Sequence, residues 1–247
     1  MAVAYDNAAS TSSSANVASL TTASWTIAGS DRILMAGVMS GAGTPVSPNA
    51  VKWGGSGGTD LTQKGSTLTF ETFGRLSQWY LVAPTAESNT LYCSWASNQD
   101  ETALGGASYT GVDQTTPHGT QATATNDAAS QTPTVNVTSA AGELVVDVAA
   151  VLDILGSRTT FVADAGQTER VKIANVGGIA YESFGMSEEA GAASVTMSWT
   201  GSGTATEAGS AIIGIPLKPV SGAADPEGSL IHGKLINGGL LINGVLN

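Results

Sequence analysis

The sequence predicts an all-β protein, an antiparallel β-sandwich built from two weakly repeated halves and followed by an extended C-terminal tail. Three observations lead to this prediction: short apolar or alternating runs recur along the chain, turn-forming residues separate them, and runs of the first part reappear in the second. The composition agrees. Hydrophobic residues make up 42% and charged residues only 12% of the chain, which is too apolar for a disordered protein.

In the first part of the chain, strand-like runs alternate with Gly, Asn, Asp, Ser and Pro clusters such as GAGTPVSPN and GGSGGTD, which are typical of turns. The runs are rich in β-branched and aromatic residues, which suit strands. The predicted strands are Ser24 to Ala28, Arg32 to Met39, Ala50 to Gly55, Thr67 to Phe73, Ser77 to Ala83, Asn89 to Ala96 and Ala103 to Val112.

The second part shows the same pattern. Only GELVVDVAAVLDILG is long enough to compete as a helix, and its valine-rich first half favours a strand because β-branched side chains lose rotamer freedom in helices. The predicted strands are Thr132 to Thr138, Gly142 to Leu152, Thr168 to Ala174, Gly177 to Met186, Ala193 to Thr200 and Gly209 to Leu217.

A weak internal repeat connects the two parts. LYCSW, which ends at Trp95, matches VTMSW, which ends at Trp199, and the same spacing places Tyr80 on Phe184. Both copies continue into a closing strand and a proline, and DRILMAGVM upstream pairs with GELVVDVAA. A duplication of this kind predicts two similar β half-units.

These observations divide the chain into a first β half (1–117), a connecting loop (118–131), a second β half (132–219) and a linker with an apolar tail (220–247). Segment 118–131 is polar, as expected for a loop or linker. Two tandem sandwiches and one interleaved sandwich both fit the pattern. We favour halves that share one face-to-face core, because each half alone has few strands and few large side chains.

Composition argues against several classes of protein. Nine Lys and Arg against twenty Asp and Glu give a net charge of -11, without a basic cluster, so we expect no nucleic-acid binding. No run of eighteen apolar residues occurs, so we expect no membrane span, and the N-terminal stretch lacks the pattern of a secretory signal peptide. The lone cysteine, Cys93, lies in the apolar run TLYCSW and is expected to be buried and unreactive.

No catalytic constellation or cofactor motif is evident, so we expect a protein that is not an enzyme and uses no cofactor. His118 and His232 precede glycines in polar stretches and are expected in exposed loops, without the packed surroundings of a Ser-His-Asp site. Paired carboxylates could hydrolyse glycosides, but no signature spacing links them, and we expect solvated strand faces and turns. The carboxylates concerned are Glu71, Glu101, Asp147, Glu182, Glu188 and Glu189.

Oxygen-bearing side chains in turn segments could gather around calcium. They lack the alternating Asp/Asn spacing with a distal Glu that marks a strong site, so we expect turn capping and predict no metal site. The residues concerned are Asp60, Asp113, Asn126, Asp127, Asp164 and Asp225.

Aromatic side chains could form a platform for a sugar ring. Trp95 and Trp199 occupy equivalent repeat positions and are expected to anchor the core of each half. Trp53 lies beside a glycine-rich loop and is the tryptophan expected to be exposed. Trp53 and Trp79 are therefore the candidate glycan contacts.

The C-terminal segment SLIHGKLINGGLLINGVLN combines apolar pairs with glycines and no acidic residue. The pairs recur every five residues, which fits neither a helix nor a continuous strand, so we expect short extended pieces with turns. This much apolar surface needs a partner, either other copies of the chain or a groove on another protein, although packing on its own sandwich is the alternative. The predicted assembly residues are Leu230, Ile231, Leu235, Ile236, Leu240, Leu241, Val245 and Leu246.

Four motifs of the first half occur together: an ILMAGV strand (Arg32 to Val38), WGG followed by LTQ (Trp53 to Leu61), WYLVAP (Trp79 to Pro84) and SYTGVDQTTP (Tyr109 to Pro117). This combination resembles a jelly-roll-like β-sandwich module of uncharacterised phage virion proteins and environmental bacterial surface proteins. The resemblance covers most of the first half and is blurred in the second. It implies surface display, decoration or adhesion, and it carries over no active site.

Together these interpretations predict a non-enzymatic structural protein of a phage particle, located in the virion as a capsid decoration, head fibre or tail-associated subunit. Its expected partners are other copies of itself, as a homo-oligomer such as a trimer, and other virion proteins, with a host-surface glycan as a further option. The alternative is a carbohydrate-binding or adhesin module of a bacterial surface protein, at the cell surface or outside the cell. A weaker third hypothesis is a glycoside hydrolase with strand-borne carboxylates.

Overall fold

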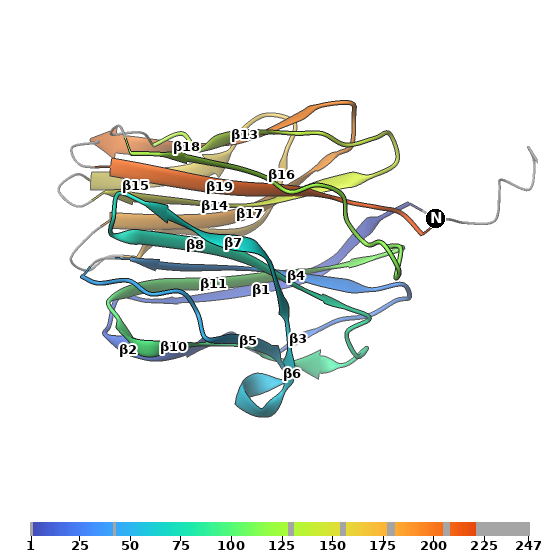
Figure 1. The fold of residues 1–247 in the computed structure, drawn as a ribbon, viewed down its shortest axis with the longest axis horizontal. Helices are drawn as coiled ribbons and strands as arrows, with labels where there is room; N and C mark the ends of the chain where they lie inside the picture. The colour runs from blue at the N-terminus through green and yellow to red at the C-terminus, as the bar shows by residue number, and fades with distance from the viewer. Residues whose placement is uncertain are drawn as a thin grey trace, which may run out of the picture.

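The chain folds into a stack of antiparallel β-sheets (Figure 1). The structure, a computed structural model, describes residues 2–41, 43–127, 131–153, 157–176, 181–204 and 208–220. Within these ranges the only helical element is a single 3-10 turn, Gly55–Gly57. The prediction of an all-β, antiparallel sandwich fold is confirmed.

The first half forms two large sheets, with strand orders β1-β11-β4-β8-β7 and β2-β10-β5-β6, and a small β3-β9 pair. Its strands are β1 (Ala4–Ser13), β2 (Val17–Thr21), β3 (Trp25–Thr26), β4 (Ile33–Gly41), β5 (Ala50–Trp53), β6 (Thr59–Asp60), β7 (Thr62–Phe70), β8 (Gly74–Val82), β9 (Ser88–Asn89), β10 (Leu91–Gln99) and β11 (Glu101–Thr110).

The second half repeats this topology, with sheet orders β12-β19-β14-β17-β16 and β13-β18-β15. The correspondence is strand for strand: β1 matches β12, β4 matches β14, β8 matches β17, β10 matches β18 and β11 matches β19. The predicted repeat is therefore confirmed. The strands are β12 (Ala122–Asn126), β13 (Thr134–Val137), β14 (Leu144–Asp153), β15 (Ser157–Ala163), β16 (Thr168–Val176), β17 (Tyr181–Ala190), β18 (Val195–Thr204) and β19 (Ala208–Leu217).

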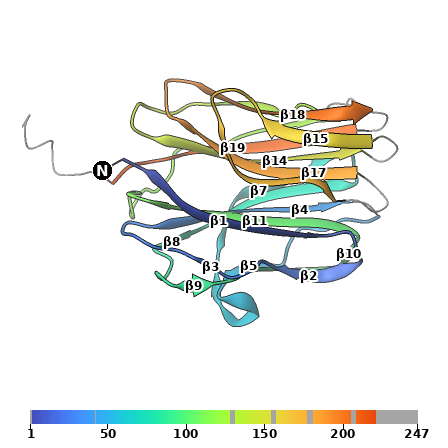
Figure 2. The ribbon, with the colours of Figure 1, turned by 180° about the vertical axis from the view of Figure 1, so that it is seen from behind.

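The four large sheets lie on one another as four layers, and Figures 1 and 2 show this arrangement from the two sides. Each half has an outer and an inner sheet, and the two inner sheets face each other. Three hydrophobic cores result: one inside the first half, one inside the second half, and a third between the halves. We call the third core the shared layer. Our preference for a single shared core was thus incomplete, because each half also closes a core of its own.

The central strands of the inner sheets are buried on both faces, which explains their continuous apolar runs. In β4, Ile33, Met35 and Met39 enter the shared layer. Leu34, Ala36 and Val38 enter the core of the first half instead. Because side chains alternate along a strand, one strand supplies two cores.

Glycine allows the inner sheets to approach closely around one aromatic ring. Phe184 of β17 lies in the shared layer and is fully buried. A Cβ atom at Gly105 of β11 would lie 2.8 Å from this ring, and a Cβ at Gly37 of β4 would lie 2.9 Å from it. The ring of Phe184 therefore occupies the space that a side chain at Gly105 would fill, and at Gly37 it does so together with the side chain of Val148, with which a Cβ there would collide.

Several strands of the structure were not predicted. β12 lies inside the segment 118–131, which was predicted to be a connecting loop, and β1, β2 and β15 also lie outside the predicted runs. All four are edge strands of their sheets. Their Ala, Ser and Thr residues do not form a strong apolar pattern, because an edge strand needs little buried side-chain surface when its backbone is paired on one side.

Candidate functional site

The two tryptophans predicted to contact a glycan are buried, so that prediction is wrong. Trp53 is 2% exposed and packs edge-to-face against Trp25, with ring centroids 5.1 Å apart. Trp79 is 7% exposed and donates its indole N–H to the hydroxyl of Ser77 at 2.9 Å. The alternation of side chains along β5 could have predicted this burial of Trp53, because Val51 and Trp53 point to the same side of the strand and enter the same core.

Trp95 and Trp199 are buried in the cores of the first and second halves, as predicted. The eight predicted assembly residues between Leu230 and Leu246 lie outside the described residues, as do His232 and Asp225. Their role stays a prediction.

His118 is half-buried and not in an exposed loop, which corrects the prediction. It forms a β-bridge with Leu217, and its ring packs edge-to-face on Tyr80 with centroids 4.8 Å apart. Burial lowers the pKa of His118. Its environment is a packing contact at the junction between the halves, because Tyr80 belongs to the first half and Leu217 to the second.

Most of the strand carboxylates are buried, where solvated faces were expected. Glu101, Asp147 and Glu182 have no exposed surface, and Glu188 is 8% exposed, whereas Glu71 and Glu189 are partly exposed. The sequence pattern did not predict this burial, because it does not show that each inner sheet is covered on both faces, on one by the outer sheet of its own half and on the other by the other half. The buried carboxylates are the chemically unusual groups of this fold, and each occupies a different environment.

Asp147 of β14 lies in the core of the second half with three hydrogen-bond donors around it. One oxygen accepts the backbone N–H of Ser187 at 2.7 Å and its hydroxyl at 3.0 Å, and the other accepts the indole N–H of Trp199 at 2.9 Å. Burial raises the pKa of Asp147 to about 7, and the three donors offset part of that rise. The group connects the two sheets of the second half.

Arg170 of β16 connects the two halves at one end of the shared layer. Its guanidinium lies 3.8 Å from the ring centroid of Tyr5 in β1 and pairs with Glu188 of β17 at 2.6 Å. Tyr5 in turn packs edge-to-face on Tyr109 of β11. The arrangement combines a cation–π contact with a partly buried ion pair.

Glu101 of β11 and Glu182 of β17 lie at the other end of the shared layer, one from each half. Burial, and after it the negative charge of Glu101, raise the pKa of Glu182 well above its ordinary value. The described residues donate no hydrogen bond to either carboxylate oxygen of Glu182.

The acidic residues predicted to cap turns make local contacts. Asp113 accepts the backbone N–H groups of Thr115 and Thr116, both at 2.8 Å, which is the predicted turn capping. Asp60 pairs with Lys52 at 2.7 Å. In the part of the chain that the structure describes, no three His, Cys, Asp or Glu side chains gather closely enough to hold a metal ion.

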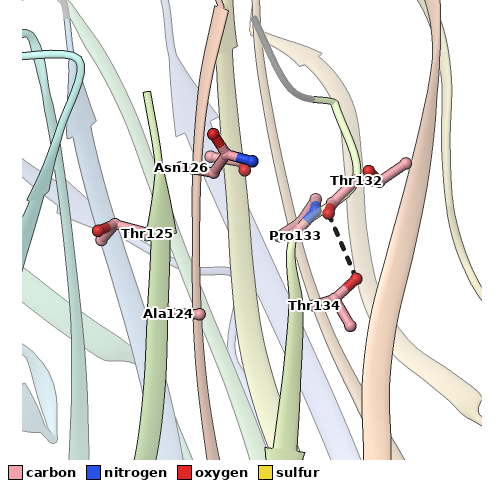
Figure 3. Close-up of a pocket in the computed structure, with 7 residues that line it drawn as sticks. Ala124, Thr125, Asn126, Thr132, Pro133 and Thr134 are labelled. Carbon is pink, nitrogen blue, oxygen red and sulfur yellow. Dashed lines mark hydrogen bonds between the residues drawn. The ribbon is translucent and has the colours of Figure 1, made fainter. Parts of the chain in front are cut away.

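A small hollow of about 180 Å³ opens at the edge of the second half, between β12 and the start of β13 (Figure 3). Its lining carries hydroxyl and amide groups and no charged side chain, and the buried hydroxyl of Ser210 in this lining receives no hydrogen bond from, and donates none to, the described residues. The hollow has the polarity for a small neutral ligand. Its residues are Ala124, Thr125, Asn126, Thr132, Pro133, Thr134 and Ser210.

Comparison with known proteins yields no match to a family model, to a curated protein or to a solved structure. Among the described residues, no helix has the length and hydrophobicity to cross a membrane. Inference about function therefore depends on the geometry above and on the sequence.

Proposed function

We propose that this protein is a non-catalytic structural subunit of a phage particle, which attaches to neighbouring copies or to other virion proteins through its C-terminal segment. The observation that carries the proposal is the way the chain leaves the stack. Val220 donates its N–H to the carbonyl of Gly111 at 2.8 Å, and Pro219 forms a β-bridge with Val112. Residues 221–247, with their apolar pairs, thus begin from a fixed point at the end of the stack where the N-terminus also lies (Figure 1).

The folded stack itself suits a structural role. Its carboxylates Glu101, Asp147 and Glu182 lie in closed layers, and the hollow beside β12 is lined by no acidic residue. The outer sheet of the second half presents hydroxyl groups, with Ser198 and Thr200 both donating to Asp164 at 2.8 Å. A rigid block with a polar outer surface is what a decoration or fibre subunit presents to solvent.

The energetics of the tail favour attachment to a partner. Burying eight aliphatic side chains contributes roughly 1.5 to 3 kcal/mol each, which must exceed the cost of ordering the segment. Main-chain hydrogen bonds to a partner add to this gain when the segment pairs with a sheet edge. The outer sheets end in such edges, β2 in the first half and β15 in the second.

Light scattering of the full chain tests the proposal. We expect an oligomer, and we expect a monomer for the chain ending at Val220 and for the full chain carrying Leu235→Ser and Leu240→Ser. A full chain with Asn237→Ser and Asn243→Ser is the matched control, because it changes polar positions of the same segment, and it should stay oligomeric. If the full chain is monomeric and also fails to co-purify with assembled particles of its source, the structural role is rejected.

The alternative of a glycan-binding module keeps one supporting observation. Its predicted platform, Trp53 and Trp79, is buried, but the hollow at β12 is polar, and the hydroxyl of Ser210, one of its lining residues, has no hydrogen-bond partner among the described residues. A glycan array tests this alternative. Sugar binding that is lost with Ser210→Val would favour an adhesin, whereas absence of any binding would leave the structural role.

A further inference from the structure

A series of hydrogen bonds runs from buried Asp147 to an exposed turn of the second half. The hydroxyl of Ser187 donates to Asp147 at 3.0 Å and accepts from the side-chain amide of Gln167 at 2.6 Å. The amide oxygen of Gln167 accepts the backbone N–H of Ser198 at 2.7 Å. Asp147 and Ser187 are buried, whereas Gln167 is partly exposed in the turn between β15 and β16 (164–167). We call these four residues the relay.

The relay has one direction, which the backbone sets. The N–H of Ser198 can only donate, so the oxygen of the Gln167 amide must face Ser198 and its N–H bonds must face Ser187. The hydroxyl of Ser187 accepts from Gln167 and turns its own proton toward Asp147. The relay therefore ends on a carboxylate that only accepts, which is the ionised form of Asp147.

The pairing of β14 with β17 is built around this carboxylate. The ladder pairs Val146 with Glu188 and then skips Asp147 and Val148. At this point the backbone N–H of Ser187 donates to the carboxylate of Asp147 at 2.7 Å. This second donor belongs to the strand itself, so it cannot turn away when Asp147 gains a proton.

The indole of Trp199 is a third donor and is equally fixed. Its N–H donates to the other oxygen of Asp147 at 2.9 Å. The ring stacks on Phe161 with centroids 4.8 Å apart, and a Cβ atom at Gly185 would collide with it. Of the three groups that donate to Asp147, only the hydroxyl of Ser187 can reverse.

The strands packed around Asp147 are low in charge. The sequences of β13, β18 and β19 contain no charged residue. On the opposite face of the inner sheet, the charge of Asp147 is one of the causes that raise the pKa of Tyr109 in the first half. The basic side chains of β16 pair with acidic ones: Arg170 with Glu188 and Lys172 with Glu169.

Two other carboxylates lie against the turn that carries Gln167. Asp164 accepts the hydroxyl of Ser198 at 2.8 Å. The carboxylate of Glu189 lies over Gly166, 3.1 Å from the position that a Cβ atom there would take. Both acids are partly exposed. They are the other possible sources of a pH effect at this turn, so the test must separate them from Asp147.

A proton on Asp147 conflicts with the direction of the relay. The new O–H needs an acceptor, and of the three groups that donate to Asp147 only the hydroxyl of Ser187 has lone pairs to offer. When this hydroxyl accepts, its own proton must turn toward Gln167, whose amide N–H also donates. We propose that Asp147 is a proton switch for the turn 164–167: protonation reverses the hydroxyl of Ser187, Gln167 releases the N–H of Ser198, and the turn loosens from β18.

The switch operates near neutral pH. Burial raises the pKa of Asp147 to about 7, so the folded chain takes up the proton as the pH falls through this value. The turn is attached above it and released below it. Overall stability changes in the opposite direction, because the unfolded chain binds this proton only near the ordinary pKa of 3.8. General acid unfolding would not combine a local release with a more stable protein.

Amide hydrogen exchange of the full chain, followed by NMR between pH 5.5 and pH 8.5, tests the proposal. Each rate is corrected for the intrinsic effect of pH. We expect the protection of the Ser198 N–H to fall roughly three- to tenfold toward pH 5.5, the effect of one lost hydrogen bond, with its midpoint near pH 7. The backbone N–H of Trp199 is the internal control, because it donates to the carbonyl of Pro133 on the other side of β18 and should stay protected.

Three substitutions separate Asp147 from the other acids. Asp147→Asn should make the protection of the Ser198 N–H independent of pH. Ser187→Ala should do the same, while the NMR signal of the Trp199 indole N–H still titrates, because Asp147 keeps its other two donors. Glu189→Gln is the matched control and should follow the wild type, since it removes a carboxylate that lies against the turn but outside the relay.

The proposal would be overturned if Ser198 protection in the wild type stayed constant while the Trp199 indole titrated near pH 7, since the proton would then reach Asp147 without moving the relay. An indole signal that does not titrate in this range would overturn it as well. A pH dependence of Ser198 that persists in Ser187→Ala would assign the effect to another acid such as Asp164, again against the proposal. If Asp147→Asn fails to fold, the wild type and Ser187→Ala still decide the matter.

Discussion

Trp199 donates its indole N–H to Asp147 at 2.9 Å, and neither side chain has any exposed surface. Trp199 lies on β18 of the outer sheet and Asp147 on β14 of the inner sheet, so this bond crosses the core of the second half. In the first half, the buried indole N–H of the repeat-equivalent Trp95 finds no hydrogen-bond acceptor in the part of the chain that the structure describes. The two copies thus keep the same aromatic anchor but differ in the polar group that holds it.

We predict that Asp147 makes the protein less stable as the pH rises. Its folded pKa of about 7 exceeds the ordinary 3.8, so its stabilising contribution is complete below about pH 4 and is lost by about pH 7. The difference between these two pKa values corresponds to about 4 kcal/mol in the free energy of unfolding. Urea unfolding of the wild type at pH 4 and pH 8, compared with Asp147→Asn, measures this contribution.

Asp147→Asn should flatten this part of the pH profile and lower stability at pH 4 by about 1–3 kcal/mol, because one buried donor loses its acceptor. An unchanged pH dependence in Asp147→Asn would contradict the assignment.

We predict that Gly105→Ala destabilises the stack by about 1–3 kcal/mol through overpacking. The new methyl group would lie 2.8 Å from the ring of Phe184. Adding Phe184→Leu should recover part of this loss, giving a favourable coupling in a double-mutant cycle. Thermal unfolding is the measurement, and Gly57→Ala is the control, since a Cβ there meets nothing within 4 Å. Independent, additive effects of the two substitutions would refute the contact.

We predict that Arg170→Met lowers the free energy of unfolding by about 2 kcal/mol, between the values for exposed and buried ion pairs. The substitution removes the cation over Tyr5 and leaves Glu188 unpaired in a mostly buried position. The comparison is Lys172→Met, whose pair with Glu169 is more exposed and should contribute about 0.5 kcal/mol or less. Equal losses in the two variants, measured by urea unfolding, would show that the position of Arg170 between the halves adds nothing.

We predict that Cys93 reacts with a thiol reagent such as DTNB only after the first half opens. Its side chain is fully buried on β10, and burial raises the pKa of its thiol well above the ordinary value. The rate of labelling in native buffer should therefore follow the opening of the protein and increase with urea. Rapid stoichiometric labelling in native buffer would contradict the burial of this strand.

The central strands were predictable from the sequence because burial on both faces requires a continuous run of apolar side chains. β4, β14 and β19 are buried on both faces and consist of continuous apolar runs, and the repeat of LYCSW and VTMSW predicted the matching positions of β10 and β18. The edge strands β1, β2, β12 and β15 were not predictable from side-chain pattern. They are defined by backbone pairing with one neighbour, and their short polar side chains resemble those of loops.

The sequence by itself determined the all-β class, the duplication and the burial of Trp95 and Trp199, because strand periodicity and repeat spacing are local properties. Only the tertiary structure decided that the inner sheets pack face to face, and that packing turned surfaces expected to be solvated into interior. Glu101 and Glu182 are buried for this reason, whereas Asp147 is buried because the outer sheet of the second half covers the other face of β14. A period of two separates the two faces of a strand, but it does not say whether the second face meets water or another sheet.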